Sequence, residues 1–202
     1  VEEYLTGQRG ELLNKAFQQY NLGSIFKTVV AAAALEDSTV NPFETVHCPG
    51  YKEVGGLRVK CSSFDEGGHG DLDMFNAYAK SCNVFFIEMG QRIGGERIIE
   101  MAERFGLGST TGVNPLEEHA GLLPQKDRIH RPDLCNISIG QGDILVTPLQ
   151  VAVMTSIIAN NGINNKPYVV KGLIDSSGKY TEVRPAEKPA KIISPFVAME
   201  IR

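Results

Sequence analysis

The longest apolar stretch of the chain is an unbroken run in which residues 28–35 are Thr-Val-Val-Ala-Ala-Ala-Ala-Leu. Alanine is the strongest helix former and the run contains no glycine or proline, so this pattern predicts a helix. Gly23 precedes the run and places Ser24 at or near the helix N-terminus, while Pro42 prevents the helix from continuing. We therefore expect a helix from Ser24 to residue 36 or 37.

Five further segments have the composition and the end signals of helices. Apolar residues at 98, 99, 102 and 105 recur with helical spacing, and Gly106 follows them in the manner of a C-cap. Thr147-Pro148-Leu149-Gln150 matches a capping box with proline at the first helical position, and Ser194-Pro195 is a similar start. These helices are expected at 72–80 (with Asp71 as N-cap), 84–90, 96–105, 148–160 and from 195 onward.

Strand patterns are shorter and fewer. Residues 51–59 carry a Gly-Gly pair at their centre and predict a hairpin, and segments 168–174 and 179–183 predict two strands joined by a Ser-Ser-Gly turn. Residues 62–70 are expected to be a glycine-rich loop, and 109–136 are expected to be mostly loop. The predicted helices outnumber the predicted strands, and together they predict an α+β fold. We expect a helical subdomain packed on an antiparallel sheet that this chain only partly contains.

Length and composition are those of one ordinary globular domain, with 202 residues of which 42% are hydrophobic and 22% charged. The net charge of −4 and the lack of a basic cluster argue against nucleic-acid binding. No apolar run approaches the length of a membrane span, and no secretory signal opens the sequence. The first residue is valine, so we expect a piece of a longer protein or a processed product.

The four cysteines fit no short metal-binding spacing, and we predict no metal site from them. Cys48 and Cys61 flank the 51–59 hairpin, so they could face each other and pair, or remain free thiols. Cys82 and Cys135 stand alone in the sequence. Cys82 is interpreted as a packing residue because no histidine is spaced to form a catalytic dyad with it.

Ser24 and Lys27 are the first candidates for chemistry. Residues three apart on a helix share a face, so the lysine amine is expected within reach of the serine hydroxyl. Unpaired N–H groups at a helix start favour developing negative charge, and a lysine in a dry pocket can act as a base. The simpler interpretation is a serine N-cap followed by a surface lysine. Ser176 and Lys179 have the same spacing, but in a turn composition.

Ser81-Cys82-Asn83 is the second candidate, because it lies between two predicted helices where a tight connection can direct both polar side chains inward. Taken alone, it is also explained as a helix C-cap with asparagine in the turn. Combined with the serine–lysine helix upstream, it matches the S-x-x-K and S-x-N motif pair of active-site-serine enzymes.

With these motifs, the sequence resembles the transpeptidase domain of class B penicillin-binding proteins over about residues 12–200. The resemblance implies the α+β fold shared by penicillin-binding proteins and serine β-lactamases. The blocks that carry it, in order, are Tyr20-Asn21-Leu22-Gly23-Ser24-Ile25-Phe26-Lys27 (Leu22 where the family usually has proline), Cys48-Pro49-Gly50, Gly68-His69-Gly70, Ala79-Lys80-Ser81-Cys82-Asn83, Phe105-Gly106-Leu107-Gly108, and Ile139-Gly140-Gln141-Gly142 followed by Thr147-Pro148-Leu149-Gln150.

One family motif is missing. The family's K-T-G or K-S-G strand does not occur, and Thr110-Thr111-Gly112 lacks the lysine and follows a helix. In the family this motif comes after the equivalent of Ser194-Pro195, so the resemblance implies that it lies beyond Arg202. Residues 1–202 are then expected to be a partial transpeptidase domain, truncated at both ends, in which turnover is lost if the site is incomplete.

The resemblance also implies a role for each site residue. Ser24 is the nucleophile, Lys27 its base, Ser81 a proton relay toward the leaving amine, and Asn83 a holder of Lys27 and of the substrate backbone. Two interpretations of Gly140-Gln141-Gly142 have equal support: a substrate-binding segment and a structural turn. His69 is interpreted as a structural loop residue, since Lys27 already fills the role of base.

The implied partners are peptidoglycan stem peptides, β-lactams and proteins of a cell-wall synthesis complex. No cofactor, metal or nucleic acid is expected, and the implied location is the extracytoplasmic face of the cell membrane, through an anchor outside this sequence. Two alternatives stay open: a non-catalytic penicillin-recognising sensor or scaffold, and a serine β-lactamase. The β-lactamase would need a base for deacylation, for which Glu117 or Glu118 is the candidate.

Overall fold

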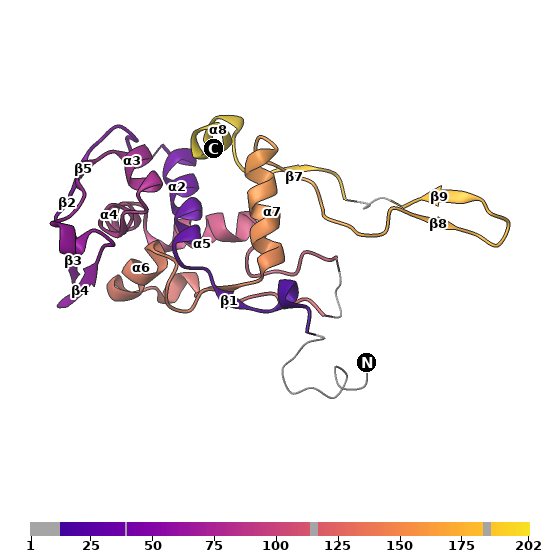
Figure 1. Cartoon of the computed structure of the whole chain (residues 1–202), viewed down its shortest axis with the longest axis horizontal. Helices are drawn as coiled ribbons and strands as arrows, with labels where there is room; N and C mark the ends of the chain where they lie inside the picture. Colours follow the sequence, from indigo (N-terminus) through magenta and orange to yellow (C-terminus); the bar gives the residue numbers. More distant parts are fainter. Residues whose placement is uncertain (1–12, 39, 114–116, 184–186) are drawn as a thin grey trace.

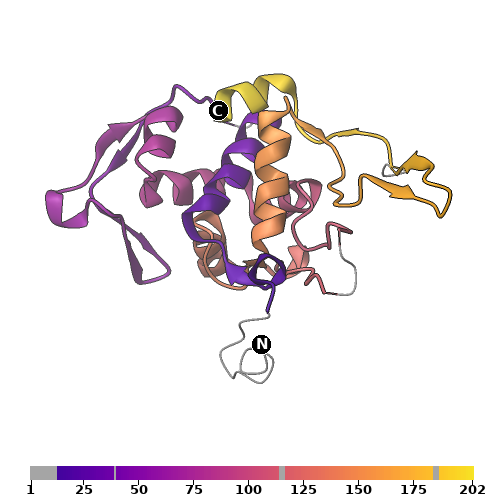
Figure 2. The same ribbon diagram turned by 45° about the vertical axis from the view of Figure 1, so that its right-hand side comes forward.

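The computed structural model describes residues 13–38, 40–113, 117–183 and 187–202, so Leu12 and residues 114–116 of the Glu117 loop lie outside it. A body of helices occupies the centre, a small β region lies at one side, and a long hairpin projects from the other (Figure 1). Figure 2 shows the same division, with α2 (Lys27–Glu36) and α7 (Pro148–Ala159) upright in the middle of the body.

The helix predicted from Ser24 is the centre of the body. A 3-10 turn, η2 (Gly23–Phe26), leads directly into α2 (Lys27–Glu36), and every residue of α2 up to Leu35 is buried. A helix that is apolar on all sides must be covered on all sides. Four helices supply that cover, and the alanines of α2 let them approach closely: α3 (Met74–Ala79), α4 (Asn83–Ile93), α5 (Gly95–Arg104) and α8 (Pro195–Ile201).

The surrounding helices are α3 (Met74–Ala79), α4 (Asn83–Ile93), α5 (Gly95–Arg104), α6 (Arg131–Ser138), α7 (Pro148–Ala159) and α8 (Pro195–Ile201), with 3-10 turns η1 (Lys15–Phe17), η3 (Phe64–Glu66) and η4 (Lys126–Arg128). The helices predicted at 84–90, 96–105, 148–160 and from 195 are confirmed. The capping box is formed, with Thr147 Oγ1 accepting from Gln150 N and Gln150 Oε1 accepting from Thr147 N. In the part of the chain described, no helix combines the length and the apolarity that crossing a bilayer requires.

The start of one predicted helix was wrong. The N-cap of α3 is Asp73, whose Oδ1 accepts from Asn76 N at 2.8 Å, and not Asp71. Asp71 belongs to strand β5 (Gly70–Leu72), because pairing with β2 (Val46–Cys48) extends the chain there. Residues 109–136 were expected to be mostly loop, and most of the described ones are, but helix α6 begins at Arg131 within this stretch; its Pro132 is in the first turn, where proline is tolerated.

The described strands form five antiparallel two-stranded ribbons: β1 (Tyr20–Asn21) with β6 (Leu145–Val146), β2 with β5, β3 (Tyr51–Val54) with β4 (Leu57–Lys60), β7 (Ile163–Asn164) with β10 (Ala190–Lys191), and β8 (Gly172–Ile174) with β9 (Tyr180–Glu182). The 51–59 hairpin is confirmed, with Gly55 and Gly56 both at positive φ in its turn. The second hairpin is confirmed as well, but its first strand begins at Gly172 rather than at residue 168. The predicted α+β class is therefore correct.

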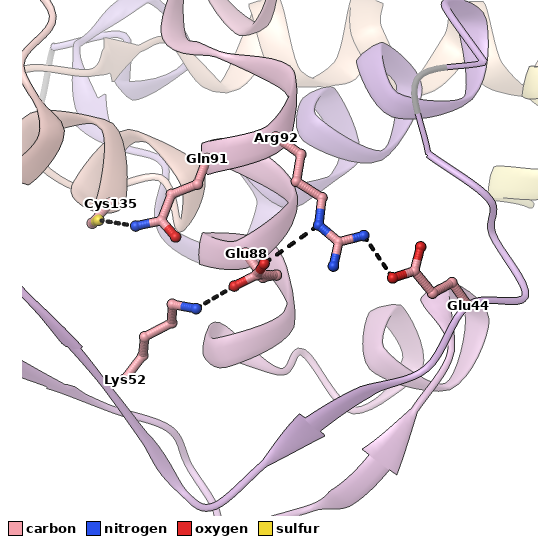
Figure 3. A network of polar contacts seen from close by, with 6 residues as sticks. All are labelled: Glu44, Lys52, Glu88, Gln91, Arg92 and Cys135. Atoms are coloured by element: carbon pink, nitrogen blue, oxygen red, sulfur yellow. Dashed lines mark hydrogen bonds and ion pairs between the residues drawn. The ribbon is translucent and has the colours of Figure 1, made fainter.

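An ion-pair network attaches α4 to the β region (Figure 3). Glu88 accepts from Lys52 of β3 and, at 3.3 Å, from Nε of Arg92, whose Nη1 donates to Glu44 at 2.9 Å. The hydrogen bond from Lys52 holds the pKa of the Glu88 carboxyl below its ordinary value. Because α4 begins at Asn83, the network also anchors the helix that carries one of the predicted site residues.

Candidate active site

Ser24 lies at the exposed N-terminal end of an otherwise buried helix. Gly23 has a φ of 59°, and its N–H donates to Gly140 O at 2.9 Å and to Asn21 Oδ1 at 3.2 Å. These bonds hold the turn that presents Ser24 to solvent while Phe26, two residues on, is fully buried. The predicted position of Ser24 at the helix start is confirmed.

Gly140 packs against the turn that carries Gly23 and Ser24. A Cβ at Gly140 would lie 1.9 Å from Gly23 O, so only glycine permits the approach of the two backbones. Gly142 O accepts from Asn21 Nδ2 at 3.4 Å, and Gln141 is exposed. Gly140 thus has a structural role, and substrate binding by Gln141 and Gly142 stays a prediction.

Lys27 brings the predicted catalytic residues together. Its Nζ lies 3.2 Å from Ser24 Oγ, 2.9 Å from Ser81 Oγ, 2.7 Å from Ser81 O and 2.7 Å from Asn83 Oδ1. The side chain is 1% exposed, and its ammonium nitrogen also lies 5.7 Å from the centre of the Phe86 ring. Ser24, Lys27, Ser81 and Asn83 therefore meet at one point, as the motif pair predicted.

The amine of Lys27 has neutral oxygen neighbours. Within the described residues, the oxygens that contact Nζ belong to hydroxyl, amide and backbone carbonyl groups and not to a carboxylate. Burial lowers the pKa of Lys27 from its ordinary value, and the nearby thiols of Cys61 and Cys82 oppose that shift. A lysine with a lowered pKa is neutral more readily, which a general base requires.

Ser81 lies in a strained turn between α3 and α4. Its φ is 52°, a left-handed conformation that residues with a side chain rarely adopt, and Ser81 N donates to Tyr78 O at 3.0 Å. Cys82 N donates to Ala77 O at 2.9 Å, which completes a helix C-cap. The C-cap interpretation therefore describes this turn, and the catalytic role of Ser81 stays a prediction.

Asn83 connects Lys27 to the β3–β4 hairpin. Its Oδ1 accepts from Lys27, and its Nδ2 donates to Lys60 O at 2.9 Å. Since a lysine nitrogen donates in such contacts, these two bonds determine which way the amide faces. The contact with Lys27 agrees with the expectation that Asn83 holds this lysine. The amide nitrogen of Asn83 is hydrogen-bonded to the β3–β4 hairpin.

A second cluster, which the sequence analysis did not identify, lies beside this site. The Sγ atoms of Cys48, Cys61 and Cys82 and a ring nitrogen of His69 all lie within 4.8 Å of one another. The cysteines are buried and reduced, so of the two states left open for Cys48 and Cys61 the structure has free thiols. Long and unequal sequence spacings conceal this cluster, although its members occur in or beside the family-like blocks.

The thiols of this cluster differ in acidity. Burial opposes ionisation of Cys61, but N–H groups of Asn83, Ser63 and Val84 directed at its sulfur lower its pKa to about 7. Burial raises the pKa of Cys82 to about 12. Cys61 is therefore the thiol that the protein stabilises as a thiolate.

Glu118 is held in its own loop. Its Oε2 accepts from Thr111 N at 2.6 Å, from Thr111 Oγ1 at 2.9 Å and from Gly112 N at 3.2 Å. These bonds orient the carboxylate toward the 111–112 backbone.

A serine on the first turn of a buried helix, a lysine one turn later and a facing Ser-x-Asn turn define the class of active-site-serine, penicillin-recognising folds. The family model described as the penicillin binding protein transpeptidase domain matches residues 2–202. The chain belongs to this family.

Relatives of this chain are named as penicillin-binding proteins and peptidoglycan transpeptidases. It is 38% identical over 184 residues to PbpB of Mycolicibacterium smegmatis, covering 89% of this chain and 27% of that protein. It is 34% identical over 185 residues to stage V sporulation protein D of Bacillus subtilis, covering 91% and 28%. The chain thus spans a little over a quarter of the length of these relatives.

Solved structures confirm the fold class. Penicillin-binding protein 3 of Mycobacterium tuberculosis, complexed with aztreonam, has a TM-score of 0.82 and 33% identity, covering 94% of this chain and 42% of that one. Penicillin-binding protein A of M. tuberculosis, a ceftriaxone acyl-enzyme complex, has a TM-score of 0.85 and 26% identity, covering 98% and 45%.

Proposed function

We propose that the chain carries the serine, lysine and Ser-x-Asn part of a peptidoglycan D,D-transpeptidase that forms an acyl-enzyme on Ser24. The observation that carries this proposal is the position of Lys27 Nζ, in contact with both Ser24 Oγ and Ser81 Oγ. Relatives named peptidoglycan D,D-transpeptidase MrdA, such as that of Haemophilus influenzae at 32% identity, support the activity.

The contacts supply a proton path for acylation. Neutral Lys27 accepts the proton of Ser24 as Oγ bonds to the carbonyl carbon between the two terminal D-alanines. Ser81 then donates its proton to the departing amine of the last D-alanine and takes one from Lys27, which restores the neutral lysine. The C–N bond breaks, and the acyl group stays on Ser24 until an amine of a second stem peptide displaces it.

The transition-state oxyanion needs hydrogen-bond donors. The backbone N–H of Ser24 is the donor that this chain offers. The sequence contains no K-T-G or K-S-G motif, and the chain covers 42% and 45% of the two solved structures described above. We therefore keep residues 1–202 as a partial transpeptidase domain and assign the second donor and the K-T-G lysine to a part of the fold outside these residues.

Ligands and location follow from the same proposal. β-Lactams present a strained amide to Ser24, and the aztreonam and ceftriaxone complexes of the neighbours support β-lactams as ligands of this site. Stem peptides are the proposed substrate, at the extracytoplasmic face of the membrane. A wider cell-wall synthesis complex is the proposed setting.

Two other functions retain the same motifs. A non-catalytic sensor or scaffold would keep the fold without turnover. A β-lactamase would need a base for deacylation. The hydrogen bonds from Thr111 and Gly112 to the Glu118 carboxylate argue against Glu118 as that base. The convergence of the Ser24, Ser81 and Asn83 side chains on Lys27 favours the transpeptidase.

Labelling with a fluorescent penicillin tests Ser24 as the nucleophile and separates a penicillin-binding protein from a β-lactamase. The protein is incubated with the probe, and intact mass and adduct lifetime are measured for the wild type, for Ser24→Ala and for Ser176→Ala, a serine of the same spacing in an exposed turn. A long-lived adduct that only Ser24→Ala removes supports the proposal. Rapid turnover identifies a β-lactamase, and an adduct that survives Ser24→Ala refutes Ser24 as the nucleophile.

A further inference from the structure

Tyr78 links two helices that carry parts of the candidate active site. Its hydroxyl lies 2.8 Å from the hydroxyl of Thr28, which directly follows Lys27 in α2. Tyr78 belongs to α3 and precedes Ser81 by three residues. Helices α2 and α3 are in contact and lie beside each other in Figure 1. The hydroxyl pair therefore connects the helix of the base to the helix that leads into the Ser-x-Asn turn.

Burial makes this pair specific. Thr28 is 7% exposed and, with Lys27, is one of the two polar residues in the buried stretch from residue 27 to residue 35. A valine would fill the same branched shape without a hydroxyl that needs a partner. A buried hydroxyl without a partner costs free energy, so threonine is favourable at this position because Tyr78 meets it.

Two further contacts of Tyr78 reach the site. Its backbone O accepts from Ser81 N at 3.0 Å. Its ring packs against the ring of Phe86, with 6.2 Å between the centroids, and the Phe86 ring centre lies 5.7 Å from Lys27 Nζ. Tyr78 thus contacts α2, the Ser-x-Asn turn and the aromatic ring beside the amine.

The position of Ser81 depends on how α3 is held. Its φ of 52° is a conformation that persists only where surrounding contacts impose it. The backbone bonds of the turn end on Tyr78 O and Ala77 O, both in the last turn of α3. Helix α3 has six residues, too few to be stable as an isolated helix, so its contacts with α2 fix it. A shift of this last turn would move Ser81 Oγ from its 2.9 Å contact with Lys27 Nζ.

We propose that Tyr78 is a positioning residue for the acylation step: through its hydrogen bond with Thr28 it holds the Ser81 hydroxyl on the amine of Lys27. Misplacing a reacting group by about 1 Å can cost about 10²-fold in rate, so a tether beside the base can govern proton transfer. The effect on rate rests on the proposed function, whereas the effect on the turn does not.

Hydrogen exchange and penicillin labelling test the proposal together. Tyr78→Phe, Thr28→Val and the double variant are compared with the wild type. Exchange of the Ser81 and Cys82 amides is followed by nuclear magnetic resonance, and labelling by fluorescent penicillin is measured as a rate per folded molecule. Each single variant should speed the exchange and slow the labelling by about 3- to 10-fold, as expected for one hydrogen bond. The double variant should show less than the product of the single effects, because both substitutions remove the same bond.

Two controls separate positioning from general stability. Thr28→Ser keeps the hydroxyl and should keep the wild-type rates. Tyr180→Phe removes a hydroxyl bond to Lys171 O at 3.2 Å, at the hairpin that projects from the body, and should leave both rates unchanged. Urea unfolding measures the stability of every variant, so that a loss of folded protein is not mistaken for slower labelling.

Three results would overturn the proposal. One is a wild-type labelling rate in Tyr78→Phe, with or without faster exchange. Another is slower labelling without faster exchange at the turn, since the bond would then not act through Ser81. The third is a double variant whose single effects multiply, because the two hydroxyls would then act independently. Wild-type protein that takes no label, while the exchange rates change as expected, counts against the proposed function alone, because amide exchange requires no catalysis.

Discussion

Replacing Gly140 by alanine tests the packing beneath the nucleophile. At a φ of 71° an alanine costs about 1–2 kcal/mol through its backbone conformation. The added Cβ would also lie 1.9 Å from Gly23 O and 2.7 Å from Phe26 Cβ, an overpacking that adds about 1–3 kcal/mol. The free energy of unfolding should therefore fall by about 2–5 kcal/mol.

Gly142→Ala is the matched control for stability. Gly142 has a similar φ of 80°, but the nearest atom to an added Cβ is Asn136 Cβ at 3.5 Å, an ordinary contact. This variant should lose only the conformational part, about 1–2 kcal/mol. Urea unfolding followed by circular dichroism measures both changes through the midpoint and slope. Equal losses in the two variants would refute the close contact between Gly140 and Gly23.

Three further predictions concern the base, the ion-pair network and a helix cap. Lys27→Met should slow fluorescent-penicillin labelling by about 10²–10⁴-fold while Lys80→Met, at an exposed lysine beside the Ser-x-Asn turn, leaves it unchanged. Because burial lowers the pKa of Lys27, the labelling rate should rise with pH and level off below 10.5; a plateau only above that value would contradict a buried base. Glu88→Gln should destabilise the protein by about 1 kcal/mol at neutral pH. Since Lys52 lowers the pKa of Glu88, this difference is complete above pH 4.5 and disappears as the pH falls through the folded-state pKa, which thermal unfolding at several pH values measures. Thr147→Ala should lose about 1 kcal/mol of stability and Thr147→Ser should retain it, in thermal melts; equal losses would exclude the capping bond.

Elements governed by neighbouring residues were predictable from the sequence. The alanine run of α2, the Thr147 capping box and the Gly55-Gly56 turn carry their structural signals within a few residues, and each was confirmed. The pairing of Ser24 with Lys27 follows from helical spacing alone. The convergence of Ser81 and Asn83 on Lys27 required the family resemblance, because a local pattern carries no information about contacts between distant segments.

Elements governed by distant partners escaped prediction. Leu72 was placed in a helix because its pairing with Val46 is invisible in the local pattern. Pro132 was treated as a loop residue although it lies in the first turn of α6, which begins at Arg131. The cysteine–histidine cluster depends on two ribbons and a helix start coming together, so no spacing rule could have indicated it.

The enclosure of α2 also limits how the region around Ser24 can change during evolution. Every position from Lys27 to Leu35 is buried, so a larger or charged residue there would disturb the packing of the surrounding helices. Tyr20 and Ile25, about half exposed at 45% and 51%, carry no such constraint. Inherited variation beside the nucleophile should therefore accumulate at these rim positions, while the helix beneath them stays nearly constant among descendants.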